Sequence, residues 1–260
     1  MRANRLPARQ GLRWIGQGFM VVRAAPIRLL LLHLAFLLAI TVTVAIPVVG
    51  FAAIWLLVPA LVIGPHAMAR AAARGVVPGP ELLLAGFRAN LAMQLRLGGV
   101  FLAAMIAVLA ATTLADDGHF AQAMVGRVRL QIGDLQNPEV QEAMLIGAVL
   151  QTAALSALWY APLLVAWNGH SVSKAAFFSA AAALINWRPF LVYGVGITLL
   201  FAFALMLALG AAMLFAGPRA AQGNAALFAV IWILLPIWFA SSYLSYRDVF
   251  DSGNSPTIPS

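Results

Sequence analysis

The sequence predicts an all-α fold, a polytopic membrane bundle of six transmembrane helices. The chain is 63% hydrophobic and only 9% charged, whereas soluble domains carry about 25% charged residues. Apolar segments recur at roughly 20 residues, the length needed to cross the hydrocarbon core of a bilayer. A break that pairs an aromatic residue with a proline recurs three times, which predicts one structural unit used three times. These observations exclude a soluble globular domain.

A single transmembrane domain is expected over residues 1–246. Its six spans are expected at about 27–46, 51–68, 97–114, 143–167, 189–215 and 225–244. The tail at 247–260 is rich in Ser, Pro, Gly and Asn, so we expect a disordered cytoplasmic segment there. The first apolar run exceeds the about 7–15 residues of a signal peptide, which indicates a retained anchor.

Residues 9–25 predict an amphipathic helix that lies on the membrane before the first span. Its apolar residues at helical spacing are Leu12, Ile15, Phe19 and Val22. Basic and polar residues lie opposite them, a pattern typical of the membrane interface. A solvated cytoplasmic tail is the alternative. Pro26 then starts the first span, where its missing N–H costs nothing.

Each later element has its own start or stop signal. Pro47 and Gly50 make a short turn between the first two spans. Pro78-Gly79-Pro80 is a helix breaker, and residues 84–95 form a second amphipathic segment before the third span. Asn137-Pro138-Glu139 opens the fourth span, with Asn as N-cap and Pro at the first helical position.

Residues 168–188 predict a third short cytoplasmic segment, again helical. Its apolar side consists of Phe177, Phe178, Leu184 and Ile185. Pro189 begins the fifth span and Gly217-Pro218 ends it. The repeated unit is therefore an amphipathic segment, a span, a return and a span with a break.

The predicted helix breaks are Pro59, Pro162 and Pro236. A proline removes one helix hydrogen bond, so neighbouring helices must satisfy the freed group. Chance recurrence is the alternative, because Trp and Pro are common in membrane helices.

Charge predicts the orientation. Thirteen of the 16 Lys and Arg residues lie in the N-terminal segment, the loops at 69–96 and 168–188, and the C-terminal tail. The acidic loop at 116–142 lies on the other side. The positive-inside rule then places both termini in the cytoplasm of a bacterial inner membrane.

Small residues at i+4 spacing predict close packing against other spans. On the third span they are Gly99, Ala103, Ala107, Ala111 and Ala115. On the fifth they are Ala204, Ala208, Ala212 and Ala216.

Polar residues inside spans are few. The core of the spans holds no Asp, Glu, Lys or Arg, which disfavours transport through buried carboxylates. We interpret His33 as a neutral histidine that bonds to a neighbouring helix, with a proton relay as the alternative. Gln151 is interpreted as contact between helices, with a polar substrate path as the alternative.

Four more candidate structural or functional residues lie at the ends of the fourth and fifth spans: Asn168, His170, Asn186 and Arg188. The helix must end after Pro162, and Gly169 suits a left-handed cap there. We therefore prefer a structural role for this exit.

Each enzyme motif that we considered is absent from the sequence or incomplete. The sequence has no His-Glu-x-x-His zinc motif and no Gly-x-Ser-x-Gly elbow, and Ser171-Val172-Ser173-Lys174 lacks the companions of the Ser-x-x-Lys motif. Asn168-Gly169-His170 and Arg188-Pro189 resemble parts of membrane lipid phosphatases, but in reversed order and without the serine. We expect no catalytic residue, metal or cofactor.

The arginines indicate contact with lipid. Candidate contacts with lipid headgroups are Arg5, Arg9, Arg13 and Arg88. A basic residue near an anionic surface contributes about 1 kcal/mol, and setting orientation alone is the other interpretation. Nucleic acid is not expected as a partner, because the arginines flank apolar spans. A membrane-protein partner or a second copy stays open.

Four motifs resemble a family of uncharacterised six-span inner-membrane proteins of proteobacteria. They are Ile46-Pro47-Val48-Val49-Gly50, Ala161-Pro162-Leu163-Leu164-Val165, Asn186-Trp187-Arg188-Pro189-Phe190 and Ser245-Tyr246-Arg247-Asp248-Val249-Phe250. The resemblance covers most of the chain except the 116–142 loop and the tail. A fainter similarity links the chain to the membrane portion of some glycerophosphodiester phosphodiesterases, without their catalytic domain. The resemblance implies a location and no activity.

The interpretation that the sequence favours is a non-catalytic scaffold or accessory protein that organises a partner or lipid. The alternative is a transporter or lipid-handling protein with a cavity between the repeats. An intramembrane enzyme is the least favoured class.

Overall fold

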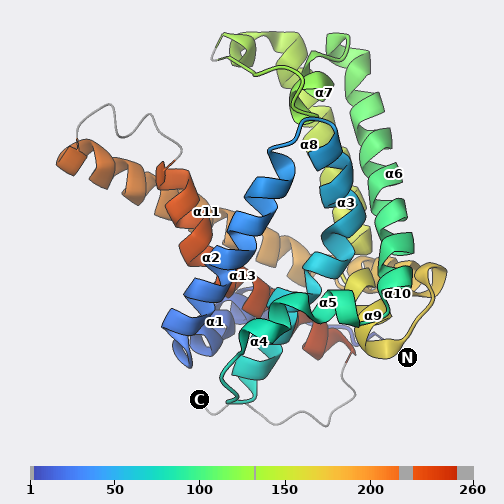
Figure 1. Ribbon diagram of the computed structural model, residues 1–260, viewed down its shortest axis with the longest axis vertical. Coiled ribbons are helices and arrows are strands. Elements are labelled where there is room, and N and C mark those ends of the chain that lie inside the picture. Colours follow the sequence, from blue (N-terminus) through green and yellow to red (C-terminus); the bar gives the residue numbers. More distant parts are fainter. Residues whose placement is uncertain (1–2, 132, 217–224, 251–260) are drawn as a thin grey trace. The chain divides into compact units, whose positions relative to one another are not determined.

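The structure is a computed structural model that describes residues 3–131, 133–216 and 225–250 (Figure 1). Over those ranges the chain forms helices and no β-strand. Six helical segments there are long and apolar enough to cross a membrane, which confirms the predicted fold class. They are Pro26–Val44, Val49–Ala73, Leu91–Asp116, Pro138–Asn168, Trp187–Phe215 and Ala225–Phe250.

The α-helices are α1 (Gln10–Arg23), α2 (Pro26–Val44), α3 (Val49–Leu61), α4 (Ile63–Ala73), α5 (Ala85–Arg88), α6 (Leu91–Asp116), α7 (His119–Met124), α8 (Pro138–Leu158), α9 (Ala161–Asn168), α10 (Val172–Ile185), α11 (Trp187–Ala216) and α13 (Ala225–Phe250). Two short 3-10 helices are η1 (Pro80–Leu84) and η2 (Asp134–Gln136). The chain divides into two compact units. Unit 1 holds Met1–Leu37, Gly64–Leu83 and Leu184–Ser260, and unit 2 holds Leu38–Ile63 and Leu84–Ala183.

In unit 1, α1 packs against α11 and α13. Two glycines allow the close approach: a Cβ on Gly11 would meet the carbonyl oxygen of Pro189, and one on Gly18 would lie 3.0 Å from that of Ile237. Trp14 lies between them and is fully buried. The predicted helix over 9–25 is therefore present, but it buries a face that the apolar periodicity did not mark.

That difference has a physical reason. Leu12 and Phe19, which the sequence places on the membrane-facing side, are 58% and 41% exposed, so they do not form the packed face. Glycine has no side chain to bury, so the spacing of apolar residues does not identify a helix face rich in glycine. Such a face can nevertheless pack most closely against another helix.

The core of unit 1 also joins α11 to α13. Val230, Leu234 and Ile237 form a buried cluster, and Ala204 and Ala208 pack against it. These two alanines belong to the predicted ladder on the fifth span, so close packing is confirmed for them. Ala212 is half-buried, and the side chain of Ala216 lies outside the described residues.

In unit 2, α6 packs against α3 and α8, and the three helices run side by side in Figure 1. A Cβ on Gly98 would overlap the carbonyl oxygen of Leu56. The prediction for the third span was wrong for Gly99, Ala103 and Ala107, which are exposed, whereas Ala111 and Ala115 are half-buried. The buried face of α6 lies one position away and includes Gly98, Phe101, Met105 and Val108.

The three prolines act differently. Pro162 lies in the first turn of α9, directly after the break that ends α8. Pro59 lies inside α3, which ends at Leu61, so the break follows it. Pro236 lies inside an unbroken α13, and the prediction of a helix break there was wrong. A membrane helix tolerates proline where its neighbours satisfy the freed backbone group.

Two further helix boundaries can be compared with the prediction: the end of α13 differs from it, and the start of α8 agrees with it. The helix α13 continues to Phe250, and Val249 and Phe250 are buried, so the predicted disordered tail does not begin at 247. The rest of that predicted tail lies outside the described residues. The N-cap of α8 is confirmed, because the side-chain oxygen of Asn137 accepts a hydrogen bond of 2.9 Å from the Glu139 N–H.

Candidate functional site at the junction of the chain ends

Asn4 and Leu6, which precede α1, are held by two distant motifs. The backbone N–H of Asn4 donates to the Val249 carbonyl at 2.8 Å, and its side-chain amide donates to the Asp248 carbonyl at 3.1 Å. Asn186, fully buried, accepts from the Leu6 N–H and donates to the Asn4 carbonyl, both at 2.9 Å. Because the Asn186 side chain satisfies backbone groups of the segment before α1, it acts as a structural clamp.

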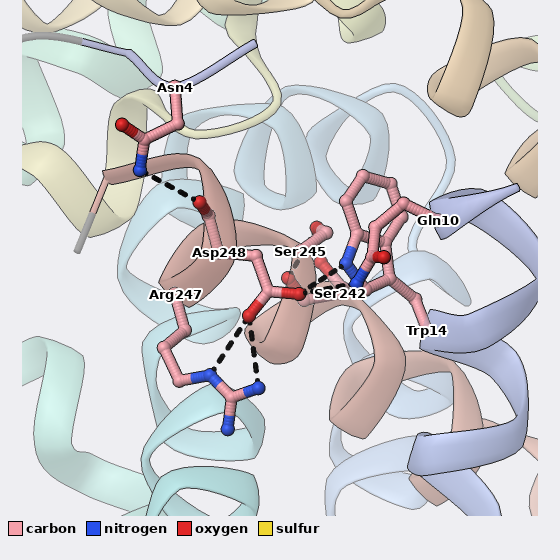
Figure 2. A network of polar contacts seen from close by, with 7 residues as sticks. All are labelled: Asn4, Gln10, Trp14, Ser242, Ser245, Arg247 and Asp248. Carbon is pink, nitrogen blue, oxygen red and sulfur yellow. Dashed lines mark hydrogen bonds and ion pairs between the residues drawn. The ribbon is translucent and has the colours of Figure 1, made fainter. Parts of the chain in front are cut away.

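The carboxylate of Asp248 is the centre of the junction (Figure 2). One oxygen, Oδ2, accepts from Gln10 Nε2 at 2.8 Å and from Trp14 Nε1 at 2.9 Å. The other oxygen, Oδ1, accepts from Arg247 Nε at 3.1 Å and Nη2 at 2.9 Å. A carboxylate has about four acceptor positions, and here each has a donor. Four hydrogen bonds of this kind hold the carboxylate in a fixed orientation and tie α1 to the end of α13.

Aromatic contacts hold the Trp14 ring in place. The ring lies edge-to-face against Phe190 and Tyr193, with centroids 6.2 and 6.0 Å away. The Tyr193 hydroxyl shares a hydrogen bond of 2.9 Å with Ser241 Oγ. Such pairs contribute about 0.5–1.5 kcal/mol each beyond the area they bury, so α1 is held by packing as well as by its bond to Asp248.

We call this cluster the terminal junction and define it by Asn4, Gln10, Trp14, Asn186 and Asp248. The sequence identified Asn186 only as a candidate and missed Asp248 and Trp14 as site residues. A signal was present, since two of the four motifs that carry the family resemblance, 186–190 and 245–250, both contribute to it. Their common role became visible only when the fold brought them to α1.

The predicted lipid contacts Arg5, Arg9, Arg13 and Arg88 all lie on the surface. Arg188 is also exposed, and its guanidinium carbon lies 5.3 Å from the centre of the Trp187 ring, a cation–π distance.

The exit after the fourth span is a capped helix end. Gly169 has φ +64°, and the N–H groups of Gly169 and His170 both point to the Leu164 carbonyl. The predicted left-handed cap is confirmed. Asn168 is exposed, and the His170 ring lies 5.7 Å from the Phe178 ring. Burial, together with the charge of Lys174, lowers the pKa of His170.

Two histidines approach one phenylalanine inside unit 1. His33 on α2 and His66 on α4 lie with ring centroids 5.8 and 5.1 Å from that of Phe239 on α13. His66 Nε2 lies 3.0 Å from Ser242 Oγ. His33 Nδ1 lies 2.8 Å from the Leu29 carbonyl. This hydrogen bond lies within α2, whereas the sequence predicted one to a neighbouring helix. The sequence did not predict that these histidines share a neighbour.

Gln151 is half-buried on α8. Within the described part of the chain, no group of three or more His, Cys, Asp or Glu side chains is placed to hold a metal ion.

The fold and its apolar helices define the class, a multi-pass α-helical membrane protein. A curated protein of Burkholderia thailandensis, described as a probable inner membrane protein, is 31% identical over 268 aligned residues, which cover 100% of this chain and 98% of that protein. The chain belongs to the same family of inner-membrane proteins. No family model and no solved structure matches it.

Proposed function

We propose that this protein is a non-catalytic scaffold or accessory protein that organises anionic lipid at the cytoplasmic headgroup level of the inner membrane. In this proposal both termini lie in the cytoplasm, as the distribution of arginines indicates. The helix α1 is the element that contacts the headgroups.

The surface of α1 carries both features that an interfacial helix needs. Its exposed residues recur at spacings of three and four and so share one side. They are Arg9, at the N-cap, followed by Leu12, Arg13, Gly16, Phe19, Met20 and Arg23. Apolar side chains reach the acyl boundary while guanidinium groups stay among the phosphates.

The charge of this region has one sign. The first acidic residue of the chain is Glu81, so the field around α1 comes from arginines alone. Each basic residue near an anionic surface contributes about 1 kcal/mol, screened over about a Debye length. The exposed Arg5 and Arg88 are further candidates for the same contact.

The observation that carries the proposal is the bond between Trp14 and Asp248. It fixes the buried side of α1, and the arginine side must then face outward. A helix held in this way loses little conformational freedom on binding, which favours affinity through preorganisation.

The test uses the full chain purified from native membranes. The variant Arg5→Gln, Arg9→Gln and Arg13→Gln should retain several-fold less phosphatidylglycerol and cardiolipin than the unaltered protein. The matched control is Arg127→Gln with Arg129→Gln, two exposed arginines in the acidic loop, which should retain the normal amount. Equal lipid retention in both variants would leave orientation as the role of the arginines. If a second protein co-purifies with the unaltered chain but not with the triple variant, the arginines would instead bind a membrane-protein partner.

A second candidate, a transporter or lipid-handling protein, is favoured by two buried acceptors. Gln94 donates from Nε2 to the Pro162 carbonyl at 3.1 Å, but its Oε1 has no hydrogen-bond partner among the described residues. The same holds for His33 Nε2. Facilitated movement of a polar solute or of lipid across vesicles that contain the purified protein would support this candidate, and no movement would count against it.

A further inference from the structure

His33 is a buried polar group in an apolar part of unit 1. Its side chain is 1% exposed, and α2 also buries Leu29, Leu32 and Phe36 beside it. A polar group in such surroundings costs free energy unless it has a hydrogen-bond partner. Polar residues inside membrane helices are therefore functional candidates by default.

The hydrogen bonds define which nitrogen is bonded. A backbone carbonyl can only accept, so the 2.8 Å contact with Leu29 requires that His33 Nδ1 carries the hydrogen. In the neutral ring, Nε2 is then an acceptor with a lone pair. That atom is buried and has no partner within the described ranges.

The surroundings of His33 come from three helices. Phe239 on α13 lies beside His33 and also beside Phe36, with a centroid distance of 5.7 Å to the latter. On α4, His66 contacts the same Phe239 ring and Ser242. The Trp232 indole donates to the Leu30 carbonyl at 2.8 Å and so ties α13 to α2 next to the site.

We propose that the α2–α4–α13 junction around Phe239 binds a hydroxyl group, which donates a hydrogen bond to His33 Nε2. A neutral donor fits better than an ammonium ion, because a charge in this apolar setting would carry a large desolvation cost. The hydroxyl belongs to water or to a small alcohol such as the glycerol of a lipid headgroup. This site is separate from the proposed lipid surface of α1 and does not depend on it.

Two substitutions distinguish the contributions of the two ring nitrogens of His33 to stability. In His33→Asn the short amide can replace Nδ1 and leaves the Nε2 position empty. In His33→Gln the longer amide reaches the Nε2 position and abandons Nδ1. If the bound hydroxyl is what matters, the Asn variant should melt at least about 3 °C below the unaltered protein, while the Gln variant stays close to it. The reverse order would show that only the bond to Leu29 matters and would overturn the proposal.

A direct measurement tests the same claim. With ¹⁵N-labelled histidine, the Nε2 resonance that disappears in His33→Phe should have the shift of an unprotonated, hydrogen-bonded nitrogen. A resonance typical of a bare nitrogen would overturn the proposal, and His33→Phe should then raise the melting temperature. Native mass spectrometry separates the sources: an alcohol-bearing lipid would appear as added mass that His33→Asn loses, and water would leave the hydrogen-bonded resonance without added mass. Both results, bound lipid and bound water, would support a hydroxyl site at His33 Nε2.

Discussion

The Trp14 indole donates a hydrogen bond of 2.9 Å to the Asp248 carboxylate, across 234 positions of the sequence. The first helix and the end of the last helix are thereby joined through one oxygen that Gln10 also contacts. A membrane helix bundle gains little from apolar burial between helices, since lipid is as apolar as leucine. Polar bonds and close backbone contacts therefore decide which helices associate.

Asp248→Ala should destabilise the purified protein by about 1–3 kcal/mol, because Trp14 Nε1 and Gln10 Nε2 then lose their acceptor. Trp14→Phe keeps a ring against Phe190 but loses the indole N–H and leaves part of a fully buried site unfilled, so it should also destabilise the protein by about 1–3 kcal/mol. Thermal unfolding in detergent measures both. The control Glu142→Ala removes an exposed carboxylate from α8 and should leave the melting temperature unchanged. An equally stable Asp248→Ala protein would refute the structural role of the junction.

Two adjacent glycines on α6 should respond oppositely to alanine. A Cβ on Gly98 would overlap the Leu56 carbonyl, whereas one on Gly99 meets nothing within 4 Å. Gly98→Ala should therefore cost about 1–3 kcal/mol through forced separation of α6 and α3. Gly99→Ala should be neutral or stabilise the helix by up to about 1 kcal/mol. Melting temperatures in one detergent decide between these outcomes, and equal effects would contradict the packing of α6 on α3.

The cap at Gly169 should tolerate asparagine but not valine. Its φ of +64° strains any L-residue, and β-branched side chains are disfavoured most. Gly169→Val should lower the yield of folded protein, while Gly169→Asn should keep most of it. His170→Ala should have no effect on yield if the exit is structural. Loss of a cellular phenotype in His170→Ala at normal abundance would instead make His170 functional.

Cysteine labelling should reveal the orientation without background, since the sequence has no cysteine. The exposed residues Gln122 and Ser173 lie in segments that the charge pattern places on opposite sides of the membrane. In intact cells with a permeable outer membrane, Gln122→Cys should react with an impermeant thiol reagent and Ser173→Cys should not. The opposite labelling would reverse the predicted topology.

Features that depend on neighbouring residues were predictable. The Asn137 cap and the left-handed Gly169 follow from one or two turns of sequence. The packed faces were not predictable in the same way. In α6 the first three members of the predicted ladder, Gly99, Ala103 and Ala107, are exposed, and the face that includes Gly98 is buried. The close contact depends on where the Leu56 carbonyl lies, which no local pattern on α6 records.

The sequence by itself determined that the chain forms six apolar spans. Each spanning helix must be long and apolar enough to cross the hydrocarbon core, and this requirement applies to each helix separately. The tertiary structure alone decided that Trp14 meets Asp248 and that His33 and His66 share Phe239. The reason is the solvent: an apolar side chain in lipid is equally stable against acyl chains or another helix. Hydrophobic periodicity therefore does not mark the packed face, and only the folded arrangement of backbone and polar groups selects it.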